Sequence, residues 1–476
     1  MIIKKYQKLS KVYDQILIHK SSPQIVANTY LHMLKAHPDT IKKYNLSRFS
    51  LIYLPIRFWI ISLIRIFQSI FVKKYNFPQA SNSEILFVSH LTNSQQLKNG
   101  SDAYFGELPN QLKERGFQSS IILIKHIRVT NQELSNNLKR SKVGRFVLNS
   151  SLSFLSELRL NITQIMSLKQ LNFIVRDLKI DSLLAKSAFL HHFSSGTFTT
   201  LRIAIQIEKI IKKTNAKYII TTFEGHAWER LVYYYARRAN PNIKCFGYQH
   251  SAVFEHQHAI RRPLNKGYNP DVVLTSGKIA ESTLKLSEFK NAKIVCLGSN
   301  KHLPPILSPC ESNCCLVVPE GSISESLILF KLSLSYALKN QHQKFIWRLH
   351  PLLNFDKLKK YSPIFKKIPN NIKLSENDLY SDIKKSNSVL YRGSTAVLNA
   401  INAGLKPIYY QQVSDEFRID PIYLCQKGKF IVKNQNELKI ALGKDMDNIS
   451  RQSLQDFAQN FYTPINIDAL LKEIII

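Results

Sequence analysis

The chain has 476 residues, 44% of them hydrophobic, which excludes a disordered chain and favours two domains with extensions. Its 66 Lys and Arg residues outnumber its 33 Asp and Glu residues, and the charge of +33 favours anionic partners such as nucleic acid, lipid headgroups or phosphorylated substrates. The six Cys residues include no CxxC pair, so we expect buried thiols in a reducing compartment, and neither a disulfide framework nor a zinc site.

The first 80 residues are unusually basic, with 13 Lys or Arg against 2 Asp or Glu. Within them, residues 51–72 form an apolar run long enough to span a bilayer, but Arg57 and Arg65 would be costly at its centre. A helix lying in the headgroup region is therefore favoured over a spanning helix or a helix buried against the protein. We expect residues 1–80 to be a basic helical segment that associates with an anionic membrane surface. Because the first apolar run begins so late, no N-terminal signal peptide is expected.

From residue 85 onwards, short apolar strands alternate with amphipathic helices. Residues 126–200 are helical and basic without clear strands, and are predicted to be an insertion. The predicted strands are 85–88, 119–124, 218–222, 243–247, 272–276 and 294–298, and the predicted helices are 108–115, 201–213 and 227–238. Residues 81–302 are therefore predicted to be one Rossmann-like domain, on the acceptor side.

A stretch with Pro304, Pro305 and Pro309 is predicted to be a linker, and a second alternating series follows it. Its predicted strands are 315–318, 345–349, 372–374, 388–391 and, as the last clear strand, 406–410; its predicted helices are 324–339, 379–385 and 395–403. Two such series imply an α/β fold with two parallel sheets covered by helices on both faces. We expect a second Rossmann-like domain at 303–440, on the nucleotide-sugar side, and C-terminal helices at 441–476. Ligands in such folds bind beyond the carboxyl ends of the strands and between paired domains.

A first candidate site follows the strand 218–222, where Phe223, Glu224, Gly225 and His226 precede a helix. A carboxylate at this place faces the cleft, and Gly225 lets a substrate approach closely. Burial is expected to raise the pKa of Glu224 enough for general-base catalysis. The alternative is that Glu224 is an ordinary acid at the start of the helix or a partner of Arg230.

The next strand ends in the sequence Gly247-Tyr-Gln-His-Ser251. His250 there is a candidate to deprotonate a sugar hydroxyl or to hydrogen-bond a diphosphate, unless backbone groups satisfy it in the loop. His256 and His258 have a spacing that can bind a metal, but no acidic third ligand is in register, so no metal site is predicted.

Polar residues also follow the opening strand of the first domain. Asn99 to Asp102 and Tyr104 are predicted to meet the acceptor, with a structural turn as the alternative. The complete set of predicted acceptor-binding residues is Gly100, Ser101, Asp102, Tyr104, Gly225 and His226.

In the second series, the sequence Arg348-Leu-His350-Pro351 stands where a strand gives way to a loop. Pro351 stops the strand and leaves His350 over its end. His350 can donate a hydrogen bond to a departing phosphate oxygen, and Arg348 adds charge. The alternative is a turn proline beside an incidental histidine.

Gly393, Ser394 and Thr395 join the strand 388–391 to the helix 395–403. A glycine turn with hydroxyl groups at a helix start can hold a phosphate, because unpaired N–H groups and the helix dipole favour an anion there. Capping of the helix by Ser394 is the alternative, and both roles are compatible.

Glu320, Gly321 and Ser322 follow the first strand of the second series. Glu320 is a candidate to hydrogen-bond the ribose or base of a nucleotide. Gly321 and Ser322 are candidates to contact its phosphate. Taken alone, this motif is short.

Together these elements resemble bacterial GT-B glycosyltransferases of surface polysaccharide biosynthesis: sialyltransferases and polysialyltransferases, capsule Kdo-transferase-like proteins, teichoic-acid CDP-glycerol transferases and more loosely defined surface-carbohydrate proteins. The sialyltransferases carry an acid-acid-Gly motif, an HP motif and a Ser-Ser/Thr motif in that order. This sequence has Phe223-Glu-Gly225, His350-Pro351 and Ser394-Thr395 within residues 85–415, with Phe223 replacing the first acid. The resemblance implies that Glu224 is the general base, that His350 assists the leaving nucleotide, and that Ser394 and Thr395 hold its phosphate.

The polyol-phosphate transferases of this group have a WHG-like histidine, an RxHP motif and serines at a later helix start. The stretches that end at His250, Pro351 and Thr395 fit that pattern about as well. His250 therefore competes with Glu224 for the role of base, and the donor stays open between CMP-, CDP- and other nucleotide-activated groups.

The function favoured by the sequence is an inverting, metal-independent transfer of a sugar from a nucleotide-sugar donor to a glycan or lipid-linked acceptor, in capsule or lipopolysaccharide synthesis. No cofactor is expected, because preorganised donors replace a divalent ion and no DxD-type acidic cluster ends a strand. The expected location is cytoplasmic, peripheral on the inner face of the bacterial plasma membrane. Alternatives are a polyol-phosphate transferase, a sugar-nucleotide 2-epimerase, and a basic membrane- or nucleic-acid-binding protein without catalysis. No recognition motif supports a nucleic-acid partner, and none is expected.

Overall fold

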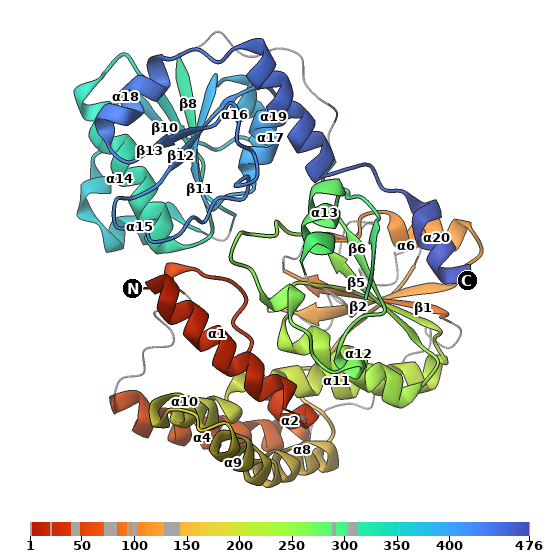
Figure 1. Cartoon of the computed structure of the whole chain (residues 1–476). Coiled ribbons are helices and arrows are strands. Elements are labelled where there is room, and N and C mark those ends of the chain that lie inside the picture. The colour runs from red at the N-terminus through yellow and green to blue at the C-terminus, as the bar shows by residue number, and fades with distance from the viewer. Residues whose placement is uncertain are drawn as a thin grey trace.

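The structure is a computed structural model, and it describes residues 2–19, 21–39, 48–70, 83–92, 96, 102–127, 143–287, 292–302, 304, 313–351 and 353–475. Two parallel β-sheets, of seven and six strands, form separate lobes with helices packed on them (Figure 1). This is the α/β architecture with two Rossmann-like units that the alternating pattern predicts.

The first sheet has the strand order β3-β2-β1-β4-β5-β6-β7, and all its pairings are parallel. Its strands are β1 Ile85–Leu91, β2 Ser119–Lys125, β3 Gly144–Val147, β4 Tyr218–Thr222, β5 Lys244–Gln249, β6 Val272–Thr275 and β7 Lys293–Cys296. The helices joined to them are α6 Leu108–Glu114, α11 Ser195–Thr214, α12 Ala227–Ala239 and α13 Lys278–Leu286. The expectation of a strandless stretch at 126–200 is wrong, because β3 lies inside it. This strand is four residues long with the buried Arg145 at its second position, which removes the apolar signal.

The second sheet has the strand order β10-β9-β8-β11-β12-β13, again with parallel pairings. Its strands are β8 Cys314–Pro319, β9 Lys344–Trp347, β10 Ile372–Leu374, β11 Ser388–Arg392, β12 Lys406–Tyr410 and β13 Phe430–Val432. Its helices are α14 Ile323–Lys339, α15 Phe355–Tyr361, α16 Leu379–Lys384, α17 Ala396–Asn402 and α18 Gln435–Gly443. The strand at 406–410 is not the last one, because β13 adds an edge. Edge strands as short as this carry almost no periodic signal.

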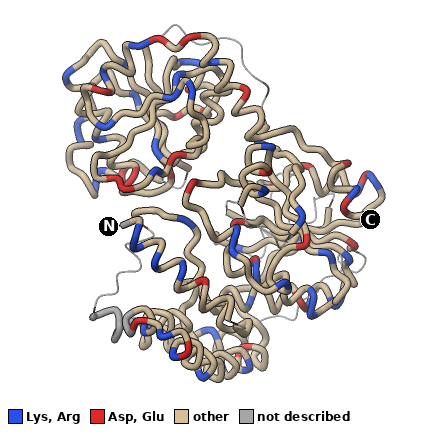
Figure 2. Tube along the Cα trace, viewed as in Figure 1, with Lys and Arg blue, Asp and Glu red and all other residues tan. Residues whose placement is uncertain are grey.

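The N-terminal residues are part of the folded body. Apolar residues of α1 (Ile2–Ile18) and α2 (Pro23–Val26) share one buried core with residues of α11 and α12. The buried guanidinium of Arg262 pairs with Asp14 on α1, which fixes that helix on the first domain. Lys residues recur along the exposed side of α1 (Figure 2).

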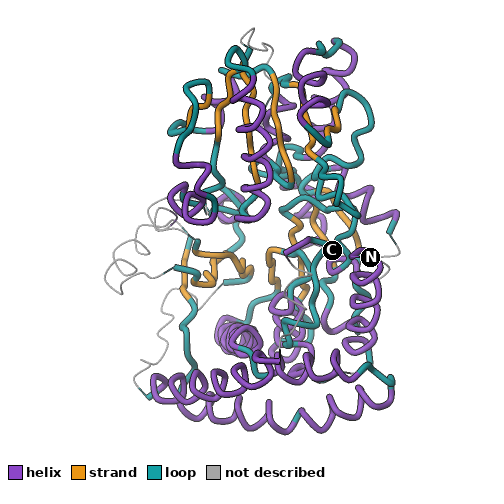
Figure 3. Tube along the Cα trace, turned by 90° about the vertical axis from the view of Figure 1, so that its left-hand side faces the viewer, coloured by secondary structure: helices purple, strands orange, loops and turns teal. Residues whose placement is uncertain are grey.

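Four further helices form a layer at the base of the first domain (Figures 1 and 3). They are α4 Arg48–Ser69, α8 Phe154–Met166, α9 Leu168–Asp177 and α10 Ser182–His192. The apolar run predicted to be helical is helical over most of its length, and its last two residues, 71 and 72, lie outside the described residues. None of the described helices is long and apolar enough to cross a membrane.

The C-terminal helices connect the two lobes. Helix α19 (Asn448–Phe461) packs on α17 of the second lobe and on α13 of the first, and α20 (Ile467–Ile475) packs on α6. A Cβ atom at Gly277 would overlap the backbone of residues 460–461, and one at Gly298 would overlap the backbone of Pro464. Glycine is required at both positions because the returning chain lies directly against them.

Candidate functional site

Side chains at the carboxyl ends of four parallel strands meet in the first domain. His90 is the penultimate residue of β1, His126 follows β2, Glu224 follows β4 and His250 follows β5. His90 links its neighbours, with Nδ1 2.9 Å from His126 Nε2 and Nε2 3.1 Å from Thr222 Oγ1. We call His90, Glu224, His226 and His250 the histidine cluster.

Glu224 is an ionised carboxylate held in place by its neighbours. Its Oε2 lies 3.2 Å from His226 Nε2, and the hydroxyl of Ser251 donates to its Oε1. Burial alone would raise its pKa, but these hydrogen bonds and the nearby His250 hold the pKa of Glu224 below its usual value. The expected rise in this pKa is therefore wrong. A quarter of the side chain stays exposed, so the carboxylate remains open to a ligand.

The two structural alternatives for Glu224 do not hold. His226, not Glu224, caps helix α12. The guanidinium of Arg230 is buried and donates to Asn269 and to the backbone of residue 259. The partners of the Glu224 carboxylate are therefore His226 and Ser251.

A neighbouring carboxylate whose pKa does rise is that of Glu229, on the first turn of α12. Burial raises the pKa of Glu229 to about 7. It accepts the backbone N–H groups of Glu224, Gly225 and His226, and so holds the loop that carries Glu224. Gly225 has φ +93, and a Cβ there would overlap the backbone of Ala259. The backbone of Ala259, and not a substrate, therefore approaches Gly225 closely.

The three histidines of the cluster differ in charge. Burial lowers the pKa of His250 to about 4 and that of His90 to about 3. Burial also acts on His226, but the bond to Glu224 and the charge of Glu229 raise its pKa to about 9. At neutral pH, His226 is protonated while His90 and His250 are neutral. The Nδ1 atom of His250 has no hydrogen-bond partner among the described residues.

The predicted acceptor residues that follow β1 have different surroundings. The Tyr104 ring meets the His250 ring edge-on, with 4.8 Å between centroids, so Tyr104 adjoins the cluster. Asp102 is buried and accepts from the Ser89 hydroxyl and from two backbone N–H groups, which is the structural-turn alternative. Gly100 and Ser101 lie outside the described residues.

The second domain has a pocket of about 360 Å³ at the carboxyl ends of its strands. His350 and Pro351 after β9 line it, together with Ser394 and Thr395 after β11. The two motifs that the sequence predicts to share a phosphate site thus line one cavity. Burial lowers the pKa of His350, so its ring is a neutral donor or acceptor at pH 7. Gly321 borders this ring, since a Cβ at Gly321 would lie 3.1 Å from His350 Nδ1.

The arginines near this pocket are already paired. Arg348 lines the pocket, but its Nη1 lies 2.9 Å from Asp382 Oδ2 and 2.6 Å from the backbone oxygen of Asn377. Arg392 is fully buried between Glu325 and Asp415. The charge that Arg348 was expected to add is therefore largely compensated by Asp382.

Glu320, Ser322 and Gly393 meet the N-terminal segment. Glu320 Oε1 lies 2.6 Å from His37 Nε2, and its carboxylate occupies the space where a Cβ of Gly393 would stand. The Ser322 hydroxyl caps α14 and donates to Asp39. Residues 37–39 thus reach the second domain.

Two lysines that no motif indicates connect the domains. Lys301, five residues after β7, lines the pocket of the second domain, and its Nζ lies 3.4 Å from the backbone oxygen of His250. Lys35 lies over the Phe254 ring at 3.5 Å. Burial lowers the pKa of both lysines, and the charge of Glu224 opposes that shift in each.

His258, considered above as a metal ligand, is held by protein groups. Its ring nitrogens lie 2.5 Å from the Tyr6 hydroxyl and 2.9 Å from Arg262 Nη2. Its spacing with His256 reflects packing of α1. Over the described part of the chain, no group of three or more His, Cys, Asp or Glu residues is arranged to hold a metal ion.

No family model matches the sequence, and no curated protein does. Solved structures that resemble this one include UDP-GlcNAc 2-epimerase from Methanocaldococcus jannaschii, with 13% identity, coverage of 79% of this chain and 98% of that one, and a TM-score of 0.45. The glycosyltransferase SnogD from Streptomyces nogalater has 14% identity, coverage of 83% and 99%, and a TM-score of 0.46. UDP-GlcNAc 2-epimerase from Neisseria meningitidis bound to UDP-GlcNAc has 12% identity, coverage of 82% and 98%, and a TM-score of 0.44. At these identities and TM-scores the likeness assigns no activity to this chain.

Proposed function

We propose that this protein is an inverting, metal-independent glycosyltransferase that moves a sugar from a nucleotide-activated donor to a glycan acceptor of a surface polysaccharide. The observation that carries the proposal is Lys301, which lines the pocket of the second domain and bonds to the backbone of His250 in the first. Lys301 thereby places a cation between a neutral histidine and a pocket of hydrogen-bond donors. That combination favours transfer of a group from a phosphate to a hydroxyl.

The donor nucleotide occupies the pocket of the second domain in this proposal. His350, the hydroxyls of Ser394 and Thr395, and Lys301 face the phosphate that departs with the nucleotide. When the bond between the anomeric carbon and the phosphate oxygen breaks, negative charge grows on that oxygen. Donors fixed in advance stabilise it without reorganisation, each by about 2–4 kcal/mol of the barrier.

The acceptor hydroxyl lies at the histidine cluster. His250 takes its proton, because its lowered pKa keeps the ring neutral at pH 7. The hydroxyl oxygen then bonds to the anomeric carbon from the side opposite the phosphate, which inverts the configuration. Glu224 remains the rival base, but its carboxylate already accepts from His226 and Ser251.

The protein acts at an anionic membrane surface in this proposal. Lys4, Lys5, Lys8 and Lys11 are exposed on α1, and large apolar side chains are exposed on α4. A helix with exposed lysines and a helix with exposed apolar side chains both suit attachment to a membrane with anionic headgroups. The acceptor is then a growing glycan or a lipid-linked one.

The test has two measurements. Melting temperatures with CMP, CDP, UDP and GDP identify the nucleotide, since a ligand at 100 times its Kd stabilises the folded state by about 2.7 kcal/mol. Lys301→Met should then weaken that nucleotide about 10- to 100-fold, the range of a hydrogen bond to a charged group. Lys344→Met, at the amino end of β9, is the matched control. If no nucleotide shifts the melting temperature, or if both variants bind alike, the proposal is wrong.

Turnover completes the test. The nucleotide selected above is supplied as its sugar and, separately, as its glycerol ester, with EDTA present and absent. Transfer from the sugar donor that EDTA leaves unchanged supports the proposal. Transfer from the glycerol donor alone would make the protein a polyol-phosphate transferase.

A further inference from the structure

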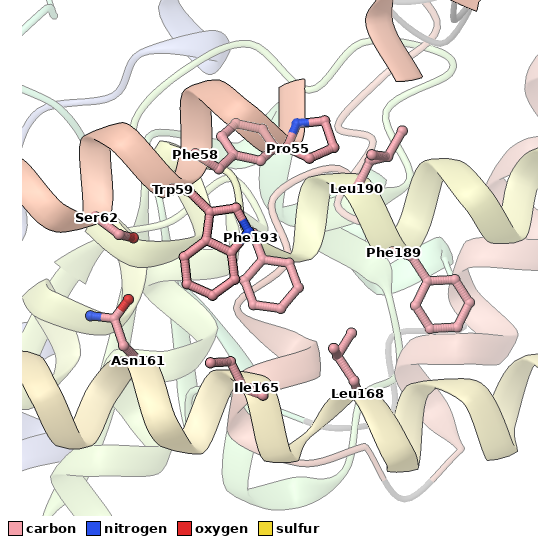
Figure 4. A pocket seen from close by; sticks show the side chains of 10 residues that line it. All are labelled: Pro55, Phe58, Trp59, Ser62, Asn161, Ile165, Leu168, Phe189, Leu190 and Phe193. Carbon is pink, nitrogen blue, oxygen red and sulfur yellow. The ribbon is translucent and has the colours of Figure 1, made fainter. Parts of the chain in front are cut away.

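An open slot of about 310 Å³ lies in the helical base, between α4, α8 and α10 (Figure 4). It shares no residue with the histidine cluster or the pocket of the second domain. Eight of its ten described lining residues are apolar, and the other two, Ser62 and Asn161, are uncharged. In the middle of the slot, the Trp59 and Phe193 rings stack with 6.4 Å between their centroids. Its volume is within the range of small-molecule sites, about 300–1,000 Å³.

Two helices that line the slot also carry large exposed apolar side chains. The exposed fraction is 63% at Leu63 and 64% at Phe67 on α4, and 74% at Leu155 and 66% at Met166 on α8. Side chains of this size are seldom exposed together on a soluble protein unless they contact another molecule. Helix α4 packs directly on α8, and we call the exposed apolar side chains of these two helices the apolar face.

The exposed charged side chains of α4 and α8 are all basic. The sequence of α4 contains no Asp or Glu, and the only acid of α8, Glu157, is buried and paired with Arg202. Arg57 and Arg159 are exposed on these two helices. On α9, the exposed Phe173 has Lys169 one turn before it and Arg176 one turn after it. An apolar surface with basic flanks matches a layer of hydrocarbon under anionic headgroups.

We propose that the slot binds one hydrocarbon chain of a membrane lipid, while the apolar face lies on the bilayer. The lining suits a chain because it offers hydrocarbon contact and almost no hydrogen bonds. The flanking arginines suit the phosphate of the same lipid. A second copy of this protein is a poorer occupant, because its own basic flanks would meet those of the first. The inference rests on the membrane attachment proposed above but not on the sugar chemistry.

Trp59 makes the slot measurable in the intact protein. The probe is 12-bromododecanoic acid below its micelle concentration, because bromine quenches a tryptophan that it touches. Trp59→Phe supplies the reference emission of the other two tryptophans. We expect saturable quenching of the Trp59 emission that unbrominated dodecanoic acid reverses by competition.

Two kinds of variant distinguish binding of the probe in the slot from binding of vesicles to the apolar face. Ser62→Phe and Asn161→Phe fill the slot from opposite sides, and each should weaken the probe at least tenfold while vesicles of phosphatidylglycerol and phosphatidylcholine still bind. Leu63→Glu on the apolar face should do the reverse, with vesicle binding reduced at least tenfold and probe binding retained. Circular dichroism checks that each variant folds.

Three outcomes would overturn the inference. One is no quenching of the native protein by the probe. Another is quenching that both filled variants retain. The third is self-association in the absence of lipid that Leu63→Glu abolishes, without vesicle binding by the native protein, because the occupant would then be a second copy. Since the native protein and the competing acid suffice for the first outcome, misfolding of the filled variants does not leave the inference untested. Loss of glycosyl transfer would not affect it.

Discussion

The two domains end their central strands in opposite ways. In the first domain, His90, Glu224, His226 and His250 lie together, and their pKa values are pushed apart. In the second domain, the strong charges at the strand ends are paired: Arg348 with Asp382, and Arg392 with Glu325 and Asp415. One strand-end region is set up to move a proton, and the other to offer neutral donors.

The different charge states of the two strand-end regions match the different groups that they would bind in the proposed reaction. Groups whose pKa values are driven apart provide an acid and a base at one pH. A departing phosphate needs donors that are already oriented, and a partner-bound arginine keeps the surrounding loops in place. The predictions below test whether the division between the domains is real.

The largest expected effect is that of His250→Ala. Loss of a general base lowers turnover about 10²- to 10⁴-fold. Nucleotide affinity, measured by melting temperature, should change little, because the nucleotide binds in the other domain. His256→Ala, which removes a nearby histidine outside the cluster, is the control. Equal turnover in these two variants would remove His250 from the chemistry.

His350→Ala tests the other domain. Removal of one donor to developing charge costs about 10²- to 10³-fold in kcat. The control is His342→Ala, at an exposed histidine before the amino end of β9. If the two domains divide the work as proposed, a donor whose nucleotide is a better leaving group should rescue His350→Ala and not His250→Ala. If the better leaving group rescued both variants, the proposed division of roles between the two domains would be wrong.

Most strands and the places where they end could be predicted from the sequence, because buried parallel strands are continuous apolar runs followed by polar turns. His350, Ser394 and Thr395 were found that way, and they line one pocket. The same rule would have found His90 at the end of β1, but the polar residues from Ser89 onwards gave that stretch the pattern of a loop.

Other features had no local signal. Lys301 and Lys35 matter only because the fold brings a connection and an N-terminal segment between the domains. The pKa of Glu224 depends on hydrogen bonds from His226 and Ser251, and only the tertiary arrangement of those groups decides whether burial or pairing prevails. Distant contacts of this kind leave no periodicity in the sequence.

The pH dependence of turnover sharpens the comparison. His250 must be neutral to accept a proton, so turnover should fall about tenfold per pH unit as pH drops below about 4. His226 stays protonated up to about pH 9 and holds Glu224, so turnover should fall again above that value. His226→Gln should remove the alkaline limb, keep the acidic limb and lower the plateau by about tenfold or less. If turnover of His226→Gln still falls at alkaline pH, the titration of a group other than His226 causes that fall.

The smallest expected effect concerns the segment between the domains. The 2.6 Å contact of His37 with Glu320 joins the N-terminal residues to the strand end of β8. A hydrogen bond to a charged group contributes about 1.5–3 kcal/mol to the folded state. Because His37 does not line the nucleotide pocket, only part of that loss reaches the bound nucleotide, so His37→Ala should weaken nucleotide binding severalfold and lower the melting temperature. His37→Gln keeps a donor and should behave like the native protein. If His37→Ala instead lowers kcat as far as His350→Ala does, with nucleotide affinity unchanged, then the N-terminal segment takes part in the chemistry, and the division lies among three parts of the chain rather than between two domains.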